Sequence, residues 1–318
     1  MAFNPARDIK DLEGKVILVT GGNAGLGASK VKALAAHNPA CIYLCCRKLE
    51  SGQAVIDAIH QTIPEANVQV LQLDLNCFDS VKKCASEVDT KSDRLDILFL
   101  NAGISATSPA LSYEGYEQQF GVNHMGHALL TQLLMPKLLE TQHVTGSEPR
   151  IIVTSSIGGH RIAPKQGLVL DQMKTDGASI APMVRYGHSK LANMLFARKL
   201  SQVYPSIIAT SYHPGTVKTD IWSKADGAKL LTFLVAPLVW LTGVDSDTGA
   251  QTALWLATAE KGQIENGRYY APKPWGMPKE GSKWAVDQKQ TDELWEWTNA
   301  ELAQHGAPGW PEKDSAKD

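Results

Sequence analysis

Short apolar runs alternate with amphipathic stretches along the first two hundred residues of the chain. The runs are rich in β-branched and aliphatic residues, as strands buried on both faces usually are. They lie at 15–20, 40–46, 68–73, 95–100, 150–156 and 207–215. The stretches between them, such as 51–63 and 78–88, predict helices. This alternation predicts an α/β fold, a doubly wound parallel sheet with helices on both faces.

The last third of the chain departs from this alternation. No repeat or low-complexity linker divides the sequence, so we expect one domain, with a core at 14–215 and a C-terminal extension at 216–318. The apolar run at 230–241 is interrupted by Pro237 and is shorter than the roughly 20 residues of a spanning helix. We expect it to cover the substrate or join the core, with contact at a membrane surface as the alternative.

Composition excludes several classes of protein. The formal net charge is −2 and no dense block of Lys or Arg occurs, so a nucleic-acid partner is not expected. The five cysteines are odd in number and crowd into one quarter of the chain, which favours buried thiols in a reducing compartment. The polar N-terminus lacks the apolar centre of a signal peptide. We therefore expect a soluble, cytoplasmic protein with no spanning segment.

A glycine-rich turn follows the first apolar run. Gly21, Gly25 and Gly27 occupy the spacing TGxxxGxG, with Asn23 and Leu26 between them. Glycines permit a tight turn and close approach of a pyrophosphate, and the N–H groups at the start of the next helix attract that anion. Many strand-to-helix turns are rich in glycine without binding a ligand. The position after the first strand nevertheless predicts a dinucleotide site.

The end of the second apolar run indicates which dinucleotide binds. Sites that prefer NAD usually carry an acidic residue there, bonded to the ribose 2′-hydroxyl. This chain has Arg47 and Lys48 instead. A guanidinium can grip a 2′-phosphate with two hydrogen bonds, so NADP(H) is the predicted cofactor and Arg47 the main 2′-phosphate contact. A solvated basic pair is the alternative.

The ordered set of motifs resembles the short-chain dehydrogenase/reductase family over roughly 14–260. The motifs are TGxxxGxG, LDL at 73–75, NAG at 101–103, Asn123, TSS at 154–156, Tyr186-xxx-Lys190 and HPGTVKT at 213–219. The stretches VNHMGHALLTQLL and YGHSKLANMLF resemble the branch with the retinol dehydrogenases and fungal-type reductases. The resemblance implies a Rossmann-type fold.

Two departures from the family's pattern are visible. Leu100 stands where the family often has asparagine, and we expect no loss of activity from it. The interval from Ser156 to Tyr186 is longer than in the family's short members. We expect this insertion to lie beside the substrate.

Tyr186 and Lys190 stand four positions apart in a helical pattern, which brings both side chains onto one face. A free tyrosine has a pKa of about 10, too high for a base near neutral pH. A neighbouring ammonium favours phenolate and lowers that pKa, so Lys190 would make Tyr186 a usable general acid and base. For an isolated pair, a half-buried tyrosine beside a solvated lysine is the alternative.

By resemblance, the remaining catalytic roles follow. Lys190 would also bond the nicotinamide ribose, and Ser156 would hold the substrate oxygen, with Ser155 as the competing candidate. Asn123 would complete a proton relay through a water to Lys190, or else bond the backbone as an ordinary helix-interior asparagine.

The resemblance also implies further cofactor contacts, although Asp74 could simply form a turn. These contacts are Asp74, Leu75, Asn101, Ala102, Gly103, Pro214, Gly215, Val217 and Thr219.

His124 and His127 have the spacing of a metal pair, but no carboxylate or cysteine accompanies them in the motif. We expect both to pack and hydrogen-bond in a buried helix, and we predict no metal.

The Leu, Phe and Trp content of 216–245 predicts an apolar pocket for a bulky, lipophilic ketone or alcohol. Trp222 and Phe233 are the candidate lining residues.

The family's dimer surfaces correspond to 115–140 and 186–204 of this chain, so the resemblance implies a homodimer. The alternative is that burial within one chain explains the apolar content of these two segments.

The function expected from these observations is that of an NADP(H)-dependent ketoreductase, or an alcohol dehydrogenase in reverse, acting in lipid, retinoid-like or secondary metabolism. The alternatives are a nucleotide-binding epimerase or isomerase of the extended relatives and a cofactor-bound scaffold whose chemistry has lapsed. The TGxxxGxG spacing and the Ser–Tyr–Lys set favour the reductase.

Overall fold

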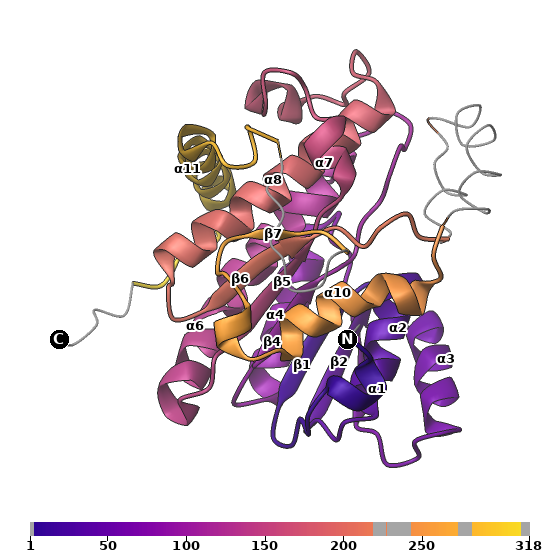
Figure 1. Cartoon of the computed structure of the whole chain (residues 1–318). Helices are drawn as coiled ribbons and strands as arrows, with labels where there is room; N and C mark the ends of the chain where they lie inside the picture. Colours follow the sequence, from indigo (N-terminus) through magenta and orange to yellow (C-terminus); the bar gives the residue numbers. More distant parts are fainter. Residues whose placement is uncertain (1–2, 219–226, 228–242, 273–281, 313–318) are drawn as a thin grey trace.

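A seven-stranded parallel sheet forms the centre of the computed structural model, which describes residues 3–218, 227, 243–272 and 282–312 (Figure 1). The strand order is β3-β2-β1-β4-β5-β6-β7. The strands are β1 (Val16–Thr20), β2 (Cys41–Cys46), β3 (Val68–Gln72), β4 (Ile97–Leu100), β5 (Arg150–Thr154), β6 (Ile208–Tyr212) and β7 (Tyr269–Tyr270). The order reverses between β1 and β4, and ligands of such sheets bind at the carboxyl ends of the strands beside this reversal.

Each of the six apolar runs contains a strand, which confirms the predicted α/β fold. The runs at 150–156 and 207–215 extend beyond their strands, which end at Thr154 and Tyr212. The residues that follow leave the sheet as loops at its carboxyl edge.

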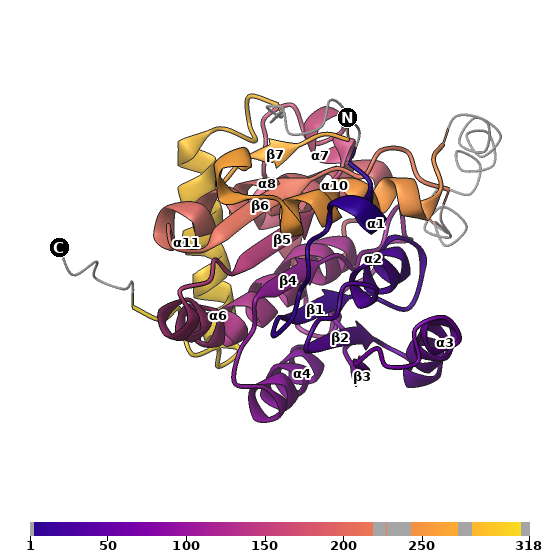
Figure 2. The ribbon, with the colours of Figure 1, turned by 60° about the horizontal axis from the view of Figure 1, so that its bottom comes forward.

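Helices cover both faces of the sheet, as Figure 2 shows. They are α1 (Pro5–Asp8), α2 (Gly25–Ala35), α3 (Leu49–His60), α4 (Phe78–Lys91), α5 (Gln118–Phe120), η1 (Gly121–Met125), α6 (Gly126–Thr145), α7 (Ile157–Arg161), η2 (Leu170–Lys174), α8 (Pro182–Val203), α10 (Ser246–Thr258), η4 (Lys261–Gln263) and α11 (Gln288–Gln304). The side chains of β1 alternate between two cores: Ile17 and Val19 join the one formed with α2, α3 and α10, and Leu18 the one formed with α4, α6 and α8.

The chain beyond residue 215 contributes to the body of the domain as well as to its periphery. Helix α10 packs against α2, and β7 extends the sheet beside β6. Helix α11 lies along α8, where its Asp292 pairs with Lys199. Burial within one chain thus accounts for much of the apolar surface of α8, and the homodimer stays a prediction.

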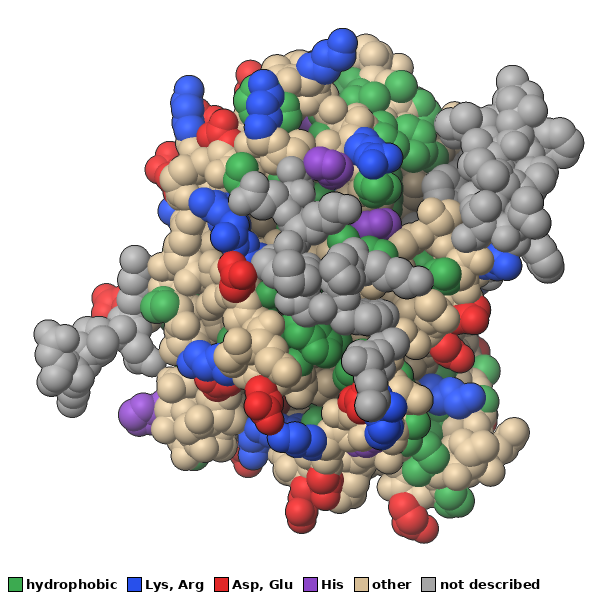
Figure 3. All heavy atoms as spheres, viewed as in Figure 1, with side chains coloured by type: hydrophobic (Ala, Val, Ile, Leu, Met, Phe, Trp, Pro, Cys, Tyr) green, Lys and Arg blue, Asp and Glu red, His purple; other side chains and the backbone are tan. Residues whose placement is uncertain are grey.

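The surface and the thiols agree with the composition. All five cysteines are free, and four of them are buried. On the face seen in Figure 1, acidic and basic side chains are interspersed (Figure 3). Among the described residues, no helix is both long enough and apolar enough to span a membrane. The apolar run at 230–241 falls outside the described residues.

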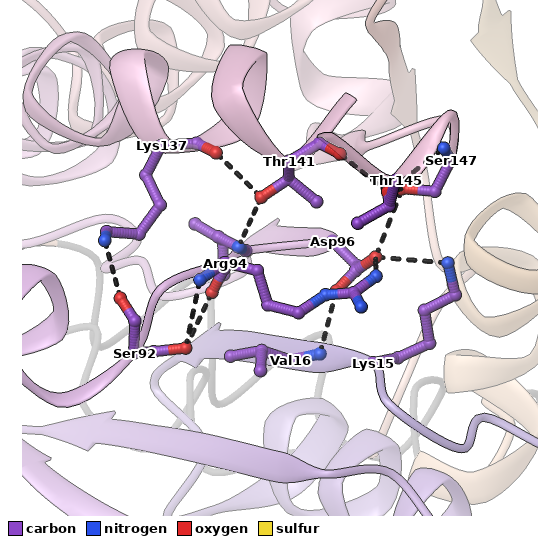
Figure 4. Close-up of polar contacts among 10 residues, drawn as sticks. Lys15, Val16, Ser92, Arg94, Asp96, Lys137, Thr141, Thr145 and Ser147 are labelled. Atoms are coloured by element: carbon purple, nitrogen blue, oxygen red, sulfur yellow. Dashed lines mark hydrogen bonds and ion pairs between the residues drawn. The ribbon is translucent and has the colours of Figure 1, made fainter. Parts of the chain in front are cut away.

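A buried carboxylate joins three strands at the edge of the sheet opposite their carboxyl ends (Figure 4). Asp96, at the start of β4, accepts hydrogen bonds from the Val16 N–H, from Lys15 Nζ at 3.1 Å and from Arg94 Nη2 at 2.6 Å. Ser147, just before β5, also donates to it. Burial raises the pKa of Asp96, but these donors outweigh it and hold the pKa below its usual range.

Replacing Asp96 with asparagine is expected to reduce the free energy of unfolding by about 2 kcal/mol near neutral pH. Since the folded carboxyl has the lower pKa, its contribution is present above the unfolded pKa of about 4 and is lost as pH falls through the folded pKa. Urea unfolding of the wild type and the variant, near neutral pH and at a pH below about 4, measures this difference. Asp93, which is exposed, provides the control variant Asp93→Asn. An equal loss at both pH values would contradict the assignment.

Candidate active site

The glycine turn connects β1 to α2 at the carboxyl edge of the sheet. Gly21 has a φ of +66°, a conformation that side-chain-bearing residues seldom adopt, and its N–H donates to Cys45 O at 2.8 Å. A Cβ on Gly27 would lie 2.0 Å from Gly21 O, so only glycine permits this close packing of helix against turn. Ala24, the N-cap of α2, provides no side-chain cap, and the first N–H groups of the helix are therefore suited to an anion.

Asn101 and Ala102, the first two residues of the NAG motif after β4, hydrogen-bond to the start of this turn. Thr20 Oγ1 accepts hydrogen bonds from the N–H groups of Asn101 and Ala102. The amide of Asn101 returns a bond to Thr20 O at 2.8 Å and a longer one to Gly21 O at 3.4 Å. Asn101 and Ala102 are thus fixed to the turn, as a shared cofactor site requires.

The residues expected around the adenosine end lie at the carboxyl ends of β2 and β3. Arg47 and Lys48 are exposed, and within the described chain their side chains form no hydrogen bond or ion pair. Asn23 reaches this region from the glycine turn, because its amide donates to Ser51 Oγ at 3.0 Å.

Asp74 and Leu75 follow β3. One Asp74 oxygen accepts from the Asn76 N–H, so the turn-forming role is present. Leu75 is buried in the core formed with α4 and α6.

Ser156 and Tyr186 meet where α7 faces α8. Ser156 caps α7, and its Oγ accepts from the Gly158 N–H at 3.0 Å. A Cβ on Gly158 would lie 3.4 Å from Ser156 Oγ and 3.2 Å from the Tyr186 ring, so the two side chains lie side by side. The competing Ser155 is buried and donates to Lys190 O at 2.6 Å, away from the phenol. The second serine of the motif therefore stays the predicted partner of the tyrosine.

Lys190 lies beside Tyr186, with Nζ 5.6 Å from the centre of the phenol ring. Its ammonium donates to Thr154 O at the end of β5, and burial lowers its pKa to about 8. Burial raises the pKa of Tyr186, while the neighbouring Ser156 hydroxyl acts in the opposite direction. The pKa of Tyr186 is thus raised, whereas the sequence predicts that it is lowered. Desolvation of the phenol outweighs the effect of its polar neighbours.

Asn123 lies in η1, a short π-helical turn that continues into α6, and such turns are frequent at functional sites. Its amide donates to Ile104 O and Ser189 Oγ, and its Oδ1 accepts from the Ile104 N–H. A Cβ on Gly103 would lie 3.0 Å from Asn123 Oδ1 and 3.3 Å from Lys190 Nζ. Asn123 and Lys190 therefore both approach the space that a side chain at residue 103 would fill.

The loop after β6 approaches the glycine turn from the other side. Val217 is buried, and it and Leu26 both lie against Gly249 of α10. Gly215 has a φ of +90°, and its N–H donates to His213 Nδ1. Pro214 lies between these two residues in the same loop. The other predicted site residues, Thr219, Trp222 and Phe233, lie outside the described residues.

His124 and His127 are both buried. His127 lies between Thr20 Oγ1 and Asn123 O, and His124 Nε2 contacts Thr298 Oγ1 of α11 at 3.2 Å. Burial lowers the pKa of His124 to about 3 and that of His127 to about 4. In the described chain no group of three or more His, Cys, Asp or Glu residues has the arrangement of a metal site.

The structure adds a polar group that the sequence analysis did not identify. Lys30 of α2 donates to Asn101 and to Tyr212 at the end of β6, and Thr154 Oγ1 donates to the same phenol oxygen at 3.1 Å. A signal was present, because Lys30 occupies the apolar face of its helix, three residues after Gly27 and four before Leu34.

Comparison with known proteins agrees with this arrangement. The short chain dehydrogenase family model matches residues 15–168. A short chain dehydrogenase/reductase of Colletotrichum higginsianum is 34% identical, covering 94% of this chain and 77% of its own length. Mouse retinol dehydrogenase 12 is 33% identical over 89% of this chain and 85% of its own.

Among solved structures, an uncharacterised protein from Mycobacterium paratuberculosis superposes with a TM-score of 0.72 and 26% identity, covering 94% of this chain and 97% of its own. The sequence relatives, the sheet order and the position of the motifs all agree. The chain is an oxidoreductase of the short-chain dehydrogenase/reductase family and belongs to its retinol-dehydrogenase-like branch.

Proposed function

We propose that the protein is an NADP(H)-dependent oxidoreductase that reduces a carbonyl of a bulky apolar substrate to an alcohol, or catalyses the reverse reaction. The observation that carries this proposal is the meeting of Ser156, Tyr186 and Lys190 at the carboxyl edge of β5. A phenol that lies beside a serine hydroxyl and a lysine amine can give a proton to a carbonyl oxygen.

The bound dinucleotide would supply or accept the hydride. Ser156 would hold the substrate oxygen beside Tyr186, whose phenol would donate the proton in reduction and accept it in oxidation. Lys190 would favour the phenolate, and the positive charge of the oxidised nicotinamide would add to this effect. Asn123 would hold the backbone of Ile104 beside Lys190 and complete the proton relay.

The exposed Arg47 and Lys48 support the choice of NADP(H) over NAD(H). Both cations follow β2, where the ribose of the adenosine lies in this fold, and neither is engaged by another described residue. Lys48 is also the N-cap of α3, so the first N–H groups of that helix face the same region.

The wild-type protein is expected to have a lower KM for NADPH than for NADH, and Arg47→Glu is expected to raise the KM for NADPH about 10- to 100-fold, because a charge-assisted bidentate contact becomes a repulsion. Steady-state rates with each dinucleotide measure this. The KM for NADH should change little, because NADH lacks the 2′-phosphate. Lys83→Glu makes the same change of charge at an exposed lysine of α4 and serves as control. An NADH preference in the wild type would refute the assignment.

The substrate class follows from the apolar segment 216–245 and is tested directly. Bulky apolar ketones and aldehydes are incubated with protein and NADPH, and loss of the absorbance of reduced nicotinamide is followed. We expect apolar carbonyls to be accepted in preference to small polar ones. If no carbonyl is reduced and no alcohol oxidised although NADPH binds, the scaffold alternative replaces this proposal.

A further inference from the structure

Lys30 places an amine in the interior of the protein, directly beneath the glycine turn. The residue is fully buried in α2, and its Nζ lies 2.5 Å from Asn101 Oδ1 and 2.8 Å from the Tyr212 hydroxyl. The same Nζ lies 5.6 Å from the centre of the Phe99 ring. Within the described chain, Lys30 forms no ion pair with a carboxylate.

Such a position is costly for the chain by itself. A buried cation without a carboxylate loses its hydration, and neutral oxygens and aromatic faces replace only part of it. Burial and the ammonium of Lys190 both lower the pKa of Lys30. An apolar side chain of similar length would avoid this cost, so the fold alone does not explain why a lysine stands here.

The hydrogen bonds of Lys30 connect it to the surface on which a dinucleotide would lie. Because Lys30 donates to Asn101 Oδ1, the NH₂ end of that amide is directed to the carbonyls of Thr20 and Gly21. The amine therefore fixes the orientation of Asn101, whose side chain joins the end of β4 to the glycine turn. Through Tyr212 it also reaches β6, next to the loop that carries Pro214 and Gly215.

We propose that Lys30 is a cofactor-positioning residue: its buried amine holds the glycine turn through Asn101 and supplies, from beneath the turn, the positive charge that the pyrophosphate of the dinucleotide complements. This inference rests on the proposed dinucleotide-dependent function. Negative phosphates above the turn favour the charged form of the amine, so the bound dinucleotide supplies the counter-charge that the chain lacks.

Lys30→Met is the informative variant, because it keeps the length of the side chain and removes the amine. The Kd for NADPH, measured by the fluorescence of the bound nucleotide, is expected to rise about tenfold or more. The Tm of the protein without nucleotide is expected to change little, because removal of a desolvated amine offsets the loss of its hydrogen bonds to Asn101 and Tyr212. Lys32→Met, at an exposed position of the same helix, should leave both quantities at their wild-type values.

The two dinucleotides separate this inference from the choice of cofactor. The pyrophosphate is common to NADPH and NADH, so the loss of affinity is expected with both. If NADH proves the preferred cofactor, the loss with Lys30→Met still supports the role of Lys30. Equal affinity of Lys30→Met and wild type for both nucleotides would overturn the role of Lys30 and leave the NADP(H) assignment intact. A fall in Tm together with an unchanged Kd would likewise show that the lysine is merely structural.

Discussion

Tyr186→Phe is expected to lower kcat for carbonyl reduction by about 10²- to 10⁴-fold, because the substrate oxygen loses its proton donor. NADPH binding should survive, since the turn, Asn101 and Arg47 are unchanged. The phenol lies beside Ser156 and on the side of α8 that also carries Lys190. Single-turnover measurements with saturating NADPH, together with the Kd for NADPH, separate chemistry from binding.

Tyr113→Phe is the matched control, because the Tyr113 side chain is 78% exposed and makes no contribution to the proposed site. Its rate should equal that of the wild type. Turnover by Tyr186→Phe at the wild-type rate would remove this phenol from the mechanism. A loss of NADPH binding in that variant would instead show that the phenol serves the cofactor more than the substrate.

Glu117→Ala is expected to reduce the free energy of unfolding by about 3–5 kcal/mol, because it leaves Arg185 buried without its counter-charge. Both side chains are completely buried, and Arg185 Nη1 lies 2.9 Å from Glu117 Oε1. The other amino group of Arg185 donates to Thr107 O at 2.7 Å, so the pair ties the loop after β4 to the first turn of α8. Burial raises the pKa of Glu117 although Arg185 opposes it. Urea unfolding at neutral pH measures the loss.

Two comparisons make this prediction specific. Glu293→Ala breaks the exposed Lys289–Glu293 pair of α11 and should cost less than about 1 kcal/mol. The double variant Glu117→Leu/Arg185→Met removes both charges and should be less destabilised than Glu117→Ala, since no buried charge remains unpaired. A loss in Glu117→Ala as small as that in Glu293→Ala would contradict the assigned role. Because Arg185 precedes Tyr186, we also expect the single variant to reduce kcat.

The sheet could be predicted from the sequence because its strands are buried on both faces. Such strands are continuous apolar runs, and every run that was identified contains one. Strand β7 could not be found in this way, since two tyrosines do not make a run. Helix α11 was also missed, because its sequence is mostly polar and its packing depends on a few apolar side chains such as Leu294 and Leu302.

The positions of the motif residues could be predicted where these residues stand at strand ends. Contacts between residues far apart in the sequence could not. Ser156 lies beside the Tyr186 ring whereas Ser155 bonds the backbone of Lys190, and the choice of Ser156 as the substrate contact stays a prediction. The pKa of Tyr186 was not predictable, because the sequence shows Lys190 four positions away and does not show the desolvation of both groups. The burial of Lys30 was not predicted, because a lysine in an amphipathic helix normally points to water.

Helix α11 contacts the insertion that precedes Tyr186. Glu301 accepts from Tyr116 and Lys174, and Gln290 bonds the backbone of Gln166 and Leu168. Every strand of the sheet precedes this helix in the chain. During synthesis on the ribosome, the sheet can therefore form while the segment before Tyr186 still lacks these anchors. Completion of these contacts must await the synthesis of α11.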